Sequence, residues 1–492
     1  MQTNERNEVR GEVHTEKVPR SRKKAFRIQR LLFSILLIVF CLIGLMIPLR
    51  PTESEAEKRK LTEFPQLSWS SFWDGSFFSE LETWYADTYP LRESMIELNG
   101  RFESLFGNRE EQIVGDISGG DTVPDVEKDE EDFDWLYNPD GEIPPVDDPP
   151  LTEPVTDPIA PPITEEPDLG DGAPIPDAPV DPDAPAEMIE SLYLIGDTAY
   201  ELYYFNQDNA DRYVDLVNGL ADELGSDATV YSIIAPLAYG IYLDKSMQDK
   251  LNLTDEDQAL IYLYSQMDDN VKKVYAYRNL LLHRNEYLYF RTDHHWTSLG
   301  AYYAYEVFCK QKGISPQKLS NLRAVEFSGF LGSLYTTAKK PAALANNPDT
   351  VIAYVPNGTN ELTYYDTAGN KVSWKVISNV TSWGAGSKYG AFIGGDQPLA
   401  EIHNPNITDG SSCVVVKNSF GNCFVPYLVD HYETVYVVDF RYFPKWSQNH
   451  NNGQTFTQFV REKGIDDVIV MTNITAATST TLLNYLENCI SE

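Results

Sequence analysis

The sequence contains few cysteines, histidines and basic residues. It has 5 Cys and 7 His among 492 residues. Four cysteines lie outside the N-terminal apolar run, and their wide spacing excludes a zinc-knuckle motif. Four cysteines in so long a chain also exclude a disulfide-dense scaffold, which leaves open one or two bridges or free buried thiols. Those four are Cys309, Cys413, Cys423 and Cys489.

Positive charge is also scarce, with 39 Lys and Arg against 74 Asp and Glu and a net charge of -35. Proteins that bind nucleic acids carry a basic surface, so we predict no nucleic-acid partner. Most of the net negative charge falls between residues 111 and 187, which are rich in Asp, Glu and Pro. Such a segment cannot bury enough apolar surface to offset its ordering entropy, and we predict a disordered linker or insertion. A calcium-binding or partner-binding tail is the alternative.

The N-terminal region combines a basic tail, residues 1–30, with an almost wholly apolar run, residues 31–49. The run is long enough to nearly cross the ~30 Å hydrocarbon core of a bilayer. The Lys and Arg excess before it indicates a cytoplasmic N-terminus. Because no small-residue cleavage site follows, a retained signal anchor is favoured over a cleaved signal peptide. We therefore predict a single-pass protein of the cell membrane whose main domain is extracytoplasmic.

Two further regions complete the predicted organisation. Residues 50–110 hold aromatic, amphipathic segments, and we expect helices that pack on the main domain, with a binding face as the alternative. Residues 188–492 form the predicted main domain, in which short apolar runs alternate with helical patterns. This alternation predicts a doubly wound α/β fold with a mostly parallel sheet, interrupted at 324–410 by inserted β-hairpins. The predicted strands are 191–195, 229–235, 273–277, 287–290, 413–417, 434–440 and 467–471, and the predicted helices are 210–224, 256–267, 297–312 and 422–429.

Ser419 lies between the apolar strand 413–417 and the predicted helix 422–429. A strand-turn-helix junction places a side chain at the carboxyl edge of the sheet, where open α/β sheets bind ligands. Free N–H groups at the start of a helix can stabilise an oxyanion, and Asn422 offers another donor. The alternative is a serine that only caps the helix.

A serine nucleophile needs an imidazole base and a group that orients it. Asp293 and His295 are two residues apart after the predicted strand 287–290 and would point to the same side of an extended segment. We predict that Asp293 orients His295 towards Ser419 and that Trp296 forms an apolar wall against water. His294 and Arg291 are predicted supports on the opposite face. Adjacent histidines on opposite faces are a poor ligand pair, so we predict no metal, and we predict no cofactor.

The motif Arg291-Thr292-Asp293-His294-His295-Trp296, with Thr297 to Tyr303 after it, resembles the signature of the DHHW protein family. That family is similar to the SGNH-hydrolase-like domains of the alginate O-acetylation proteins AlgX and AlgJ. Asp293, His295 and Trp296 match their Asp-x-His-Trp motif, and Ser419 with Phe420 matches their Asp-Ser-Phe motif, although Asn418 replaces the usual Asp. The resemblance implies an SGNH-hydrolase-like, flavodoxin-like domain. The Ser419 N–H is the first candidate for the oxyanion hole, followed by Gly394 or Gly395.

These observations together predict a membrane-anchored, extracytoplasmic serine O-acetyltransferase or esterase that acts on a cell-surface or secreted polysaccharide. His295, oriented by Asp293, would take the proton from Ser419, and an acyl-enzyme would form. The resemblance also implies a membrane-bound O-acyltransferase as the partner that supplies acetyl groups. The alternative is a non-catalytic glycan-binding or scaffold protein of cell-surface polysaccharide assembly.

Overall fold

The computed structural model describes residues 112–115, 119–126, 169 and 191–491, together with scattered positions between 53 and 89. The predicted basic tail 1–30 and membrane segment 31–49 lie outside the described residues. None of the described helices is both long and apolar enough to cross a membrane. The chain divides into two compact units, Met1–Ser94 and Met95–Glu492.

In the first unit, the short strands β1 (Glu53–Ser54) and β2 (Arg59–Lys60) pair antiparallel. Helical residues occur at positions 69, 77, 81, 84 and 85. The aromatic ring of Phe64 contacts that of Trp84 edge to face, with 4.8 Å between centroids. These positions agree with helical structure in the aromatic region 50–110, and its packing on the main domain stays a prediction.

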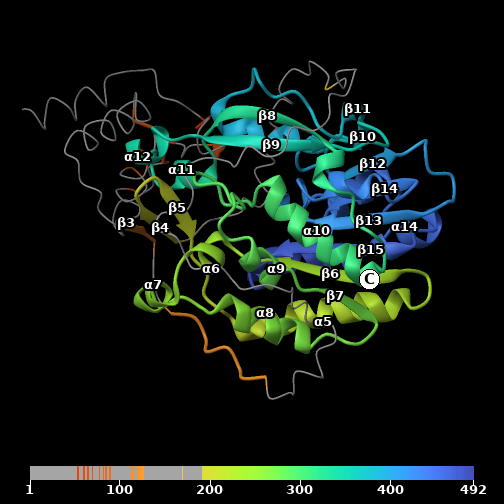
Figure 1. The fold of residues 1–492 in the computed structure, drawn as a ribbon, viewed down its shortest axis with the longest axis horizontal. Helices are drawn as coiled ribbons and strands as arrows, with labels where there is room; N and C mark the ends of the chain where they lie inside the picture. Colours follow the sequence, from red (N-terminus) through yellow and green to blue (C-terminus); the bar gives the residue numbers. More distant parts are fainter. Residues whose placement is uncertain are drawn as a thin grey trace, which may run out of the picture. The chain divides into compact units, whose positions relative to one another are not determined.

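The second unit is built on an eight-stranded mixed sheet with the order β11-β10-β12-β14-β13-β15-β6-β7 (Figure 1). The five strands from β14 to β7 are parallel, and β12, β10 and β11 extend the sheet antiparallel. The strand bounds are β6 (Thr229–Ala235), β7 (Val271–Val274), β10 (Glu361–Tyr365), β11 (Lys371–Lys375), β12 (Leu399–His403), β13 (Ser412–Lys417), β14 (Thr434–Asp439) and β15 (Asp467–Asn473).

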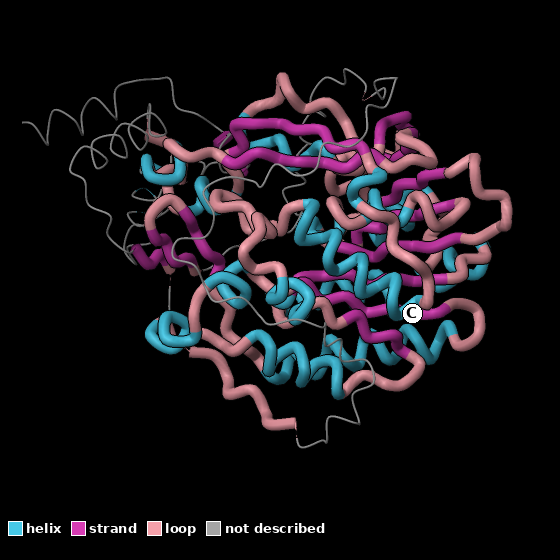
Figure 2. Tube along the Cα trace, in the orientation of Figure 1, coloured by secondary structure: helices cyan, strands magenta, loops and turns pink. Residues whose placement is uncertain are grey.

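Helices cover this sheet in two groups (Figures 1 and 2). One group contains α16, which contacts α5, α13 and α14, and the other contains α10, which contacts α9 and β7. The central strands β13 and β15 are buried along their whole length, as expected for parallel strands whose two faces are both covered. The longer helices are α5 (Gln207–Leu224), α8 (Glu256–Ser265), α10 (Ser298–Lys312), α13 (Phe443–His450), α14 (Phe456–Lys463) and α16 (Thr480–Ile490).

Shorter elements complete the unit. β3 (Gln112–Val114), β4 (Leu192–Ile195) and β5 (Thr198–Glu201) form a three-stranded antiparallel sheet, and β8 (Arg323–Phe330) pairs with β9 (Asp349–Val355). The short α-helices are α6 (Ala238–Tyr242), α7 (Lys245–Lys250), α9 (Tyr277–Leu282), α11 (Ser333–Thr337), α12 (Ala342–Ala345) and α15 (Ile474–Ala477). The 3₁₀ turns are η2 (Leu319–Asn321), η3 (Ala385–Ala391), η4 (Ser419–Gly421) and η5 (Val425–Leu428).

The predicted α/β class is confirmed as a mixed α/β fold with a large mixed sheet, whereas the predicted strand 287–290 and the predicted helix 422–429 are wrong. The run 191–195 forms the predicted strand, β4, but this strand pairs with β3 and β5 and does not join the main sheet. The run 287–290 is not a strand: the Leu288 N–H donates to the Tyr242 hydroxyl, and only Tyr289 bridges to Trp296. The predicted helix 422–429 is replaced by the short 3₁₀ turn η5, and a second 3₁₀ turn, η4, precedes it.

Part of the predicted acidic linker, residues 111–187, belongs to the folded region. β3 falls inside the predicted linker 111–187, and residues 119–126 pack as an extended segment. The Asp121 N–H donates to the Phe205 carbonyl at 2.8 Å, and the Asp121 carboxylate accepts from the Gln207 N–H at 3.0 Å. Backbone pairing and burial of Val123 and Val126 therefore order this part despite its acidity. The four cysteines of this unit are free and buried, so the disulfide alternative is wrong.

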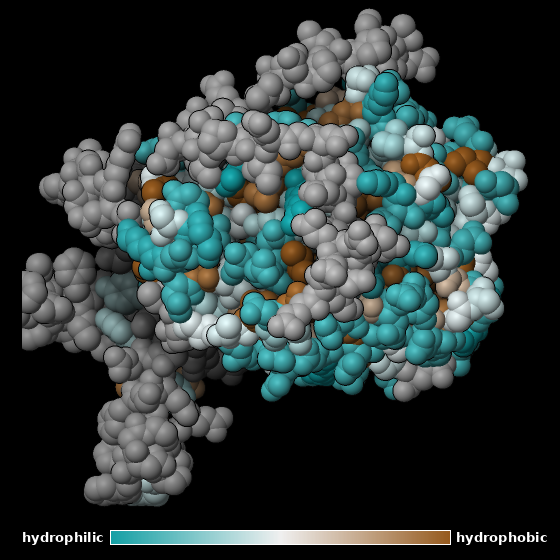
Figure 3. Space-filling model, turned by 60° about the horizontal axis from the view of Figure 1, so that its bottom comes forward, coloured by the Kyte–Doolittle hydropathy of each residue, from teal (hydrophilic) through white to brown (hydrophobic). Residues whose placement is uncertain are grey.

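On the face shown in Figure 3, the visible described residues are mostly hydrophilic, and hydrophobic ones form small, separate groups. Exposed apolar residues that occur singly or in small groups are common on protein surfaces.

Candidate active site

The motif Asp293-His294-His295 lies on a tight loop. The Phe290 N–H donates to the His295 carbonyl at 3.2 Å, which closes residues 291–295 into the loop. Asp349, at the start of β9, holds its first half: the carboxylate accepts from the Arg291 N–H at 3.2 Å and the Thr292 N–H at 2.8 Å. The Thr292 hydroxyl donates to the same carboxylate at 2.6 Å. The loop is thus anchored to β9 through a buried acid, whose pKa is raised by burial.

Ser419 follows β13 and opens the 3₁₀ turn η4. The Gly421 N–H donates to the Asn418 carbonyl at 3.0 Å, and the Asn418 side chain accepts from the Phe420 N–H at 3.2 Å. These bonds fix the turn at the carboxyl end of a central strand, where the sequence predicted the serine to lie. The turn has only three residues, so it lacks the aligned peptide dipoles of the predicted helix.

The structure brings Asp293, His295 and Ser419 together. His295 Nε2 lies 2.7 Å from Ser419 Oγ, and His295 Nδ1 lies 2.5 Å from Asp293 Oδ1. Because a carboxylate only accepts hydrogen bonds, Nδ1 carries a proton and Nε2 can accept the serine proton. Ser419, His295 and Asp293 keep only 6%, 5% and 5% exposure. In this geometry an imidazole can take a proton from a serine hydroxyl while a carboxylate orients the ring.

Asp293 stays ionised in this setting. Burial raises the pKa of this carboxyl, but the adjacent His295 imidazole and its hydrogen bond, with His294 and the Ser333 N–H, outweigh burial, so the net pKa is lowered. The Ser333 N–H and hydroxyl donate to Asp293 Oδ2 at 2.8 and 3.0 Å. A charged carboxylate held from both sides can stabilise an imidazolium at His295.

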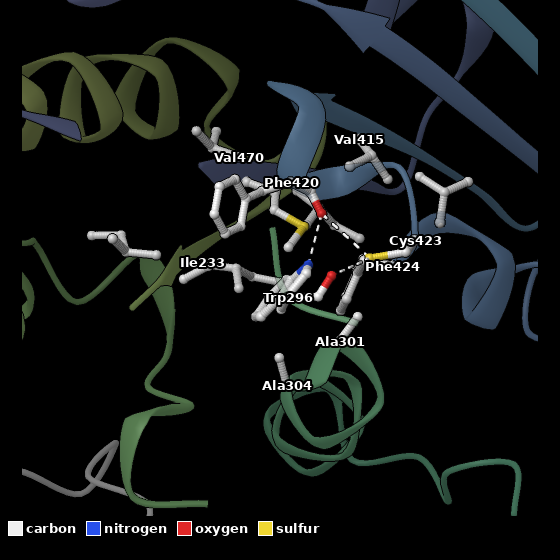
Figure 4. Close-up of a cluster of buried hydrophobic side chains, with 14 of the residues drawn as sticks. Ile233, Trp296, Ala301, Ala304, Val415, Phe420, Cys423, Phe424 and Val470 are labelled. Carbon is white, nitrogen blue, oxygen red and sulfur yellow. Dashed lines mark hydrogen bonds between the residues drawn. The ribbon is translucent and has the colours of Figure 1, made fainter. Parts of the chain in front are cut away.

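Trp296 connects the two halves of the site. Its ring is fully buried, and Nε1–H donates to the Phe420 carbonyl at 2.9 Å (Figure 4). Figure 4 shows Trp296 in a cluster of buried hydrophobic side chains that includes Ile233, Val415 and Val470. Trp296 is therefore a core residue that connects the loop to η4, the turn of the predicted nucleophile Ser419, which is called the nucleophile turn below. Its predicted action as a wall against water stays a prediction.

The predicted orientation of His294 is wrong. Its ring lies against that of His295, with 3.9 Å between centroids, and His294 Nδ1 is 2.5 Å from Ser333 Oγ. The prediction assumed an extended strand, in which neighbouring side chains point to opposite faces, whereas the segment is a loop. Arg291 stands beside Asp349, with 3.4 Å between Nε and Oδ1, and over the Tyr287 ring. Its contacts agree with a supporting position.

The prediction of no metal assumed that His294 and His295 point to opposite faces of a strand, and the loop geometry removes that argument. Asp293, His294 and His295 offer ligand atoms within 4.8 Å of one another. These groups are already hydrogen-bonded to each other, to Ser333 and to Ser419, and a metal would have to displace those bonds. The absence of a metal and of a cofactor stays a prediction.

Tyr389, from η3, is a site residue that the sequence did not single out. Its ring stacks on His295 with 4.0 Å between centroids and 11° between planes, and its hydroxyl donates to the Ser419 carbonyl at 3.0 Å. Burial, followed by the nearby Cys423, raises the pKa of Tyr389 well above its usual value, so the phenol stays protonated. No local pattern in η3 distinguishes this tyrosine from the other tyrosines of the chain.

A buried ion cluster lies beside the nucleophile turn. Lys417 Nζ is 2.7 Å from Asp396 Oδ1 and 3.0 Å from Asp439 Oδ2, and Arg441 pairs with both acids. The Asn422 side-chain N–H donates to Asp396 Oδ1 at 3.0 Å, so this N–H points to the ion cluster. A signal for the cluster exists in the sequence: Lys417 and Asp439 end two adjacent parallel strands, whose carboxyl ends meet at one sheet edge.

The two glycine candidates for the oxyanion hole, Gly394 and Gly395, differ in their contacts. The Gly395 N–H donates to the Phe392 carbonyl at 2.9 Å, so it is engaged within its own turn. Gly394 packs against Trp374, and both glycines have positive φ, 70° and 74°, which suits glycine. The next residue, Asp396, accepts a hydrogen bond from the side chain of Asn422, which directly follows the nucleophile turn. The oxyanion roles of the Ser419 N–H and Gly394 stay predictions.

A family comparison agrees with the motif. The DHHW protein model matches residues 57–438, which is most of the sequence. The chain belongs to the DHHW family. The resemblance predicted from Asp293, His294, His295 and Trp296 is thereby confirmed. No curated protein matches this DHHW chain.

Solved structures similar to this DHHW chain include a DHHW family protein from Eubacterium siraeum, at 28% identity and a TM-score of 0.54, covering 62% of this chain and 97% of the other. PatB1 from Bacillus cereus is 16% identical, with a TM-score of 0.48 and coverage of 60% and 99%. The O-acetyltransferase domain of Pseudomonas putida AlgJ is 14% identical, with a TM-score of 0.31 and coverage of 57% and 91%.

Proposed function

We propose that this DHHW protein is a serine-dependent O-acyltransferase or esterase that acts on acetyl esters of a polysaccharide. The observation that carries the proposal is the hydrogen-bonded series Asp293–His295–Ser419, with distances of 2.5 and 2.7 Å. Three side chains from two distant segments meet in the protonation pattern that activates a serine hydroxyl.

The proposed reaction has two halves. His295 Nε2 takes the Ser419 proton while Ser419 Oγ attacks the ester carbonyl carbon, and the C–O bond to the leaving alcohol then breaks as His295 returns the proton to it. In the second half, a sugar hydroxyl or water gives its proton to His295 and attacks the acyl carbonyl carbon. The bond from that carbon to Ser419 Oγ then breaks as His295 returns the proton to Oγ. The Ser419 N–H and Gly394 are the proposed donors to the oxyanion.

The finer parts of the proposal rest on the sequence. The basic tail 1–30 and apolar run 31–49 support a signal anchor with an extracytoplasmic main domain. A polysaccharide substrate and a membrane-bound O-acyltransferase as acetyl donor are supported by the Asp-x-His-Trp resemblance to alginate O-acetylation proteins. Residues 50–110, 111–187 and 188–492 would then be a helical region, an acidic linker and the catalytic domain, with residues 112–115 and 119–126 added to the folded part.

The test uses the purified full-length protein, a fluorophosphonate probe and p-nitrophenyl acetate. We expect the wild type to be labelled and to hydrolyse the ester, and Ser419→Ala to lose labelling and about 10³-fold or more in kcat. Ser382→Ala is the matched control, because Ser382 is exposed on the same unit. Equal labelling and equal turnover by wild type and Ser419→Ala would contradict the proposal.

The low exposure of Ser419 favours a second candidate, a non-catalytic glycan-binding or scaffold protein. A binding protein can retain a hydrogen-bonded triad as structure. The same variants separate the two: polysaccharide binding that is unchanged in Ser419→Ala, without labelling or turnover in the wild type, supports the binding protein.

A further inference from the structure

Asp293 is held by a second series of hydrogen bonds that leads away from Ser419. Its Oδ2 accepts from the Ser333 N–H at 2.8 Å and from the Ser333 hydroxyl at 3.0 Å. Ser333 Oγ also lies 2.5 Å from His294 Nδ1. The order of contacts is therefore Ser419, His295, Asp293, Ser333, His294.

The proton positions follow from what each group can donate. An ionised carboxylate has no proton, so the single hydroxyl proton of Ser333 points to Asp293. Ser333 Oγ must then accept from His294, which places a proton on His294 Nδ1. Every hydrogen bond in the series is therefore donated in the direction of Asp293. The carboxylate accepts from His295 through Oδ1 and from Ser333 through Oδ2.

The surroundings fix both imidazoles in place. The His294 ring lies 3.9 Å from that of His295 and 5.6 Å from that of Phe420, centroid to centroid. Tyr389 stacks on His295 at 4.0 Å. The titratable groups around the pair are Asp293 from their own loop and the Tyr389 phenol from η3, whereas α11 contributes the Ser333 hydroxyl and η4 contributes the Phe420 ring.

We propose that Ser333 and His294 are positioning residues, which orient Asp293 and limit how strongly it binds the His295 proton. The proposal rests on the proposed serine chemistry. Donors to Oδ2 spread the carboxylate charge, so less of it acts on the His295 imidazolium. Removing a donor lets the imidazolium hold its proton more strongly, and His295 then stays protonated, and inactive as a base, up to a higher pH.

The test is the rate of fluorophosphonate labelling of the full-length protein as a function of pH. In Ser333→Ala we expect the maximal labelling rate to fall about tenfold and the acid limb to move up by about half a pH unit, because one donor is lost. Ser333→Thr keeps the hydroxyl and should stay near the wild type in both. An unchanged rate and an unchanged acid limb in Ser333→Ala would overturn the proposal.

His294 is tested by a second pair of variants. His294→Leu removes the side-chain donor to Ser333 and leaves the weaker backbone donor, at 3.4 Å. It should lower the labelling rate and move the acid limb in the same direction as Ser333→Ala. His294→Asn places an amide N–H near the position of Nδ1 and should recover most of the rate. Equal behaviour of the Leu and Asn variants would contradict the role of His294.

The two proposals fail in different ways. Wild type that is not labelled at any pH would refute the serine chemistry itself. Wild type that is labelled through Ser419, with Ser333→Ala and His294→Leu unchanged, would refute only the positioning roles. Thermal unfolding of each variant identifies loss of fold, and the Thr and Asn variants keep the test decisive if an apolar variant does not fold.

Discussion

Asn418, the residue before Ser419, contacts a neighbour that an aspartate would not suit. Its Nδ2 donates to Asn473 Oδ1 at 3.0 Å, and Asn473 Oδ1 also accepts from the Ala476 N–H as the cap of α15. Both asparagines are buried. The departure from the Asp-Ser-Phe motif therefore has a local physical reason, since an amide supplies the donor that a carboxylate lacks.

Asn418→Asp should destabilise the protein by about 1–3 kcal/mol at pH 7, because a buried carboxylate would face the Asn473 oxygen without a proton between them. Burial and the facing oxygen would raise the pKa of the new acid in the folded state. The loss should then be smaller at pH 4, where the protonated acid can donate, and grow as pH rises. Urea denaturation at both pH values measures it, with exposed Asn321→Asp as control. Equal stability of Asn418→Asp and wild type at pH 7 would contradict this account.

The sequence was sufficient to select Asp293, His295 and Ser419 as neighbours, because strand ends and motif spacing restrict where they can lie. It did not predict the side on which His294 lies, since that depends on whether the backbone is a strand or a loop. Nothing in the sequence indicated that Ser333 belongs to the site. It is 40 residues from Asp293, and only the return of the chain after β8 brings the two together.

At the scale of elements, the turn between β8 and α11 must come very close to Asp293. A Cβ atom added to Gly332 would lie 2.1 Å from Asp293 Oδ2 and 2.3 Å from Asp293 Cβ. The Gly332 N–H also donates to the Thr292 hydroxyl at 3.1 Å. A residue without a side chain is thus required for α11 to present Ser333 to Asp293.

Gly332→Ala should abolish most of the esterase activity and fluorophosphonate labelling, because the methyl group would displace Asp293 from His295. We expect a fall of about 10²-fold or more in kcat/KM, as for other small displacements of catalytic groups. The control is Gly384→Ala, where an added Cβ meets no atom within 4 Å and φ is -56°. Retained labelling in Gly332→Ala would show that the close approach does not fix Asp293.

Continuous apolar runs predicted the central strands β6, β13, β14 and β15 well, since parallel strands covered on both faces need apolar residues throughout. The same rule failed at 287–290, where equally apolar residues are buried without forming a strand. There the backbone donors pair with the Tyr242 hydroxyl and the His295 carbonyl, a choice that only tertiary contacts decide. The insertion 324–410 was recognised, but sequence alone did not show that β10 and β11 extend the main sheet.

At the scale of the whole unit, the ion cluster joins three parts of the chain around the nucleophile turn. Lys417 ends β13, Asp439 ends β14 and Asp396 belongs to the turn before β12. Burial alone would raise the pKa of Asp396, but Lys417 and Arg441 outweigh burial and hold it well below its usual range. The charged form is therefore favoured by folding, and the cluster links the sheet edge to Asn422.

Asp396→Asn should lower the free energy of unfolding at pH 7 by about 1–3 kcal/mol, less than for a fully buried pair because the Asp396 side chain keeps 28% exposure. A carboxyl whose folded pKa is lowered stabilises above its unfolded pKa of about 3.9 and loses that contribution as pH falls towards the folded pKa. The difference between wild type and variant should thus be constant from pH 5 to 7 and shrink below pH 4. Urea denaturation across this range measures it, and exposed Asp269→Asn should show no such difference. A difference that persists undiminished as pH falls below 4 would mean that packing, and not the charge of Asp396, holds the turn in place.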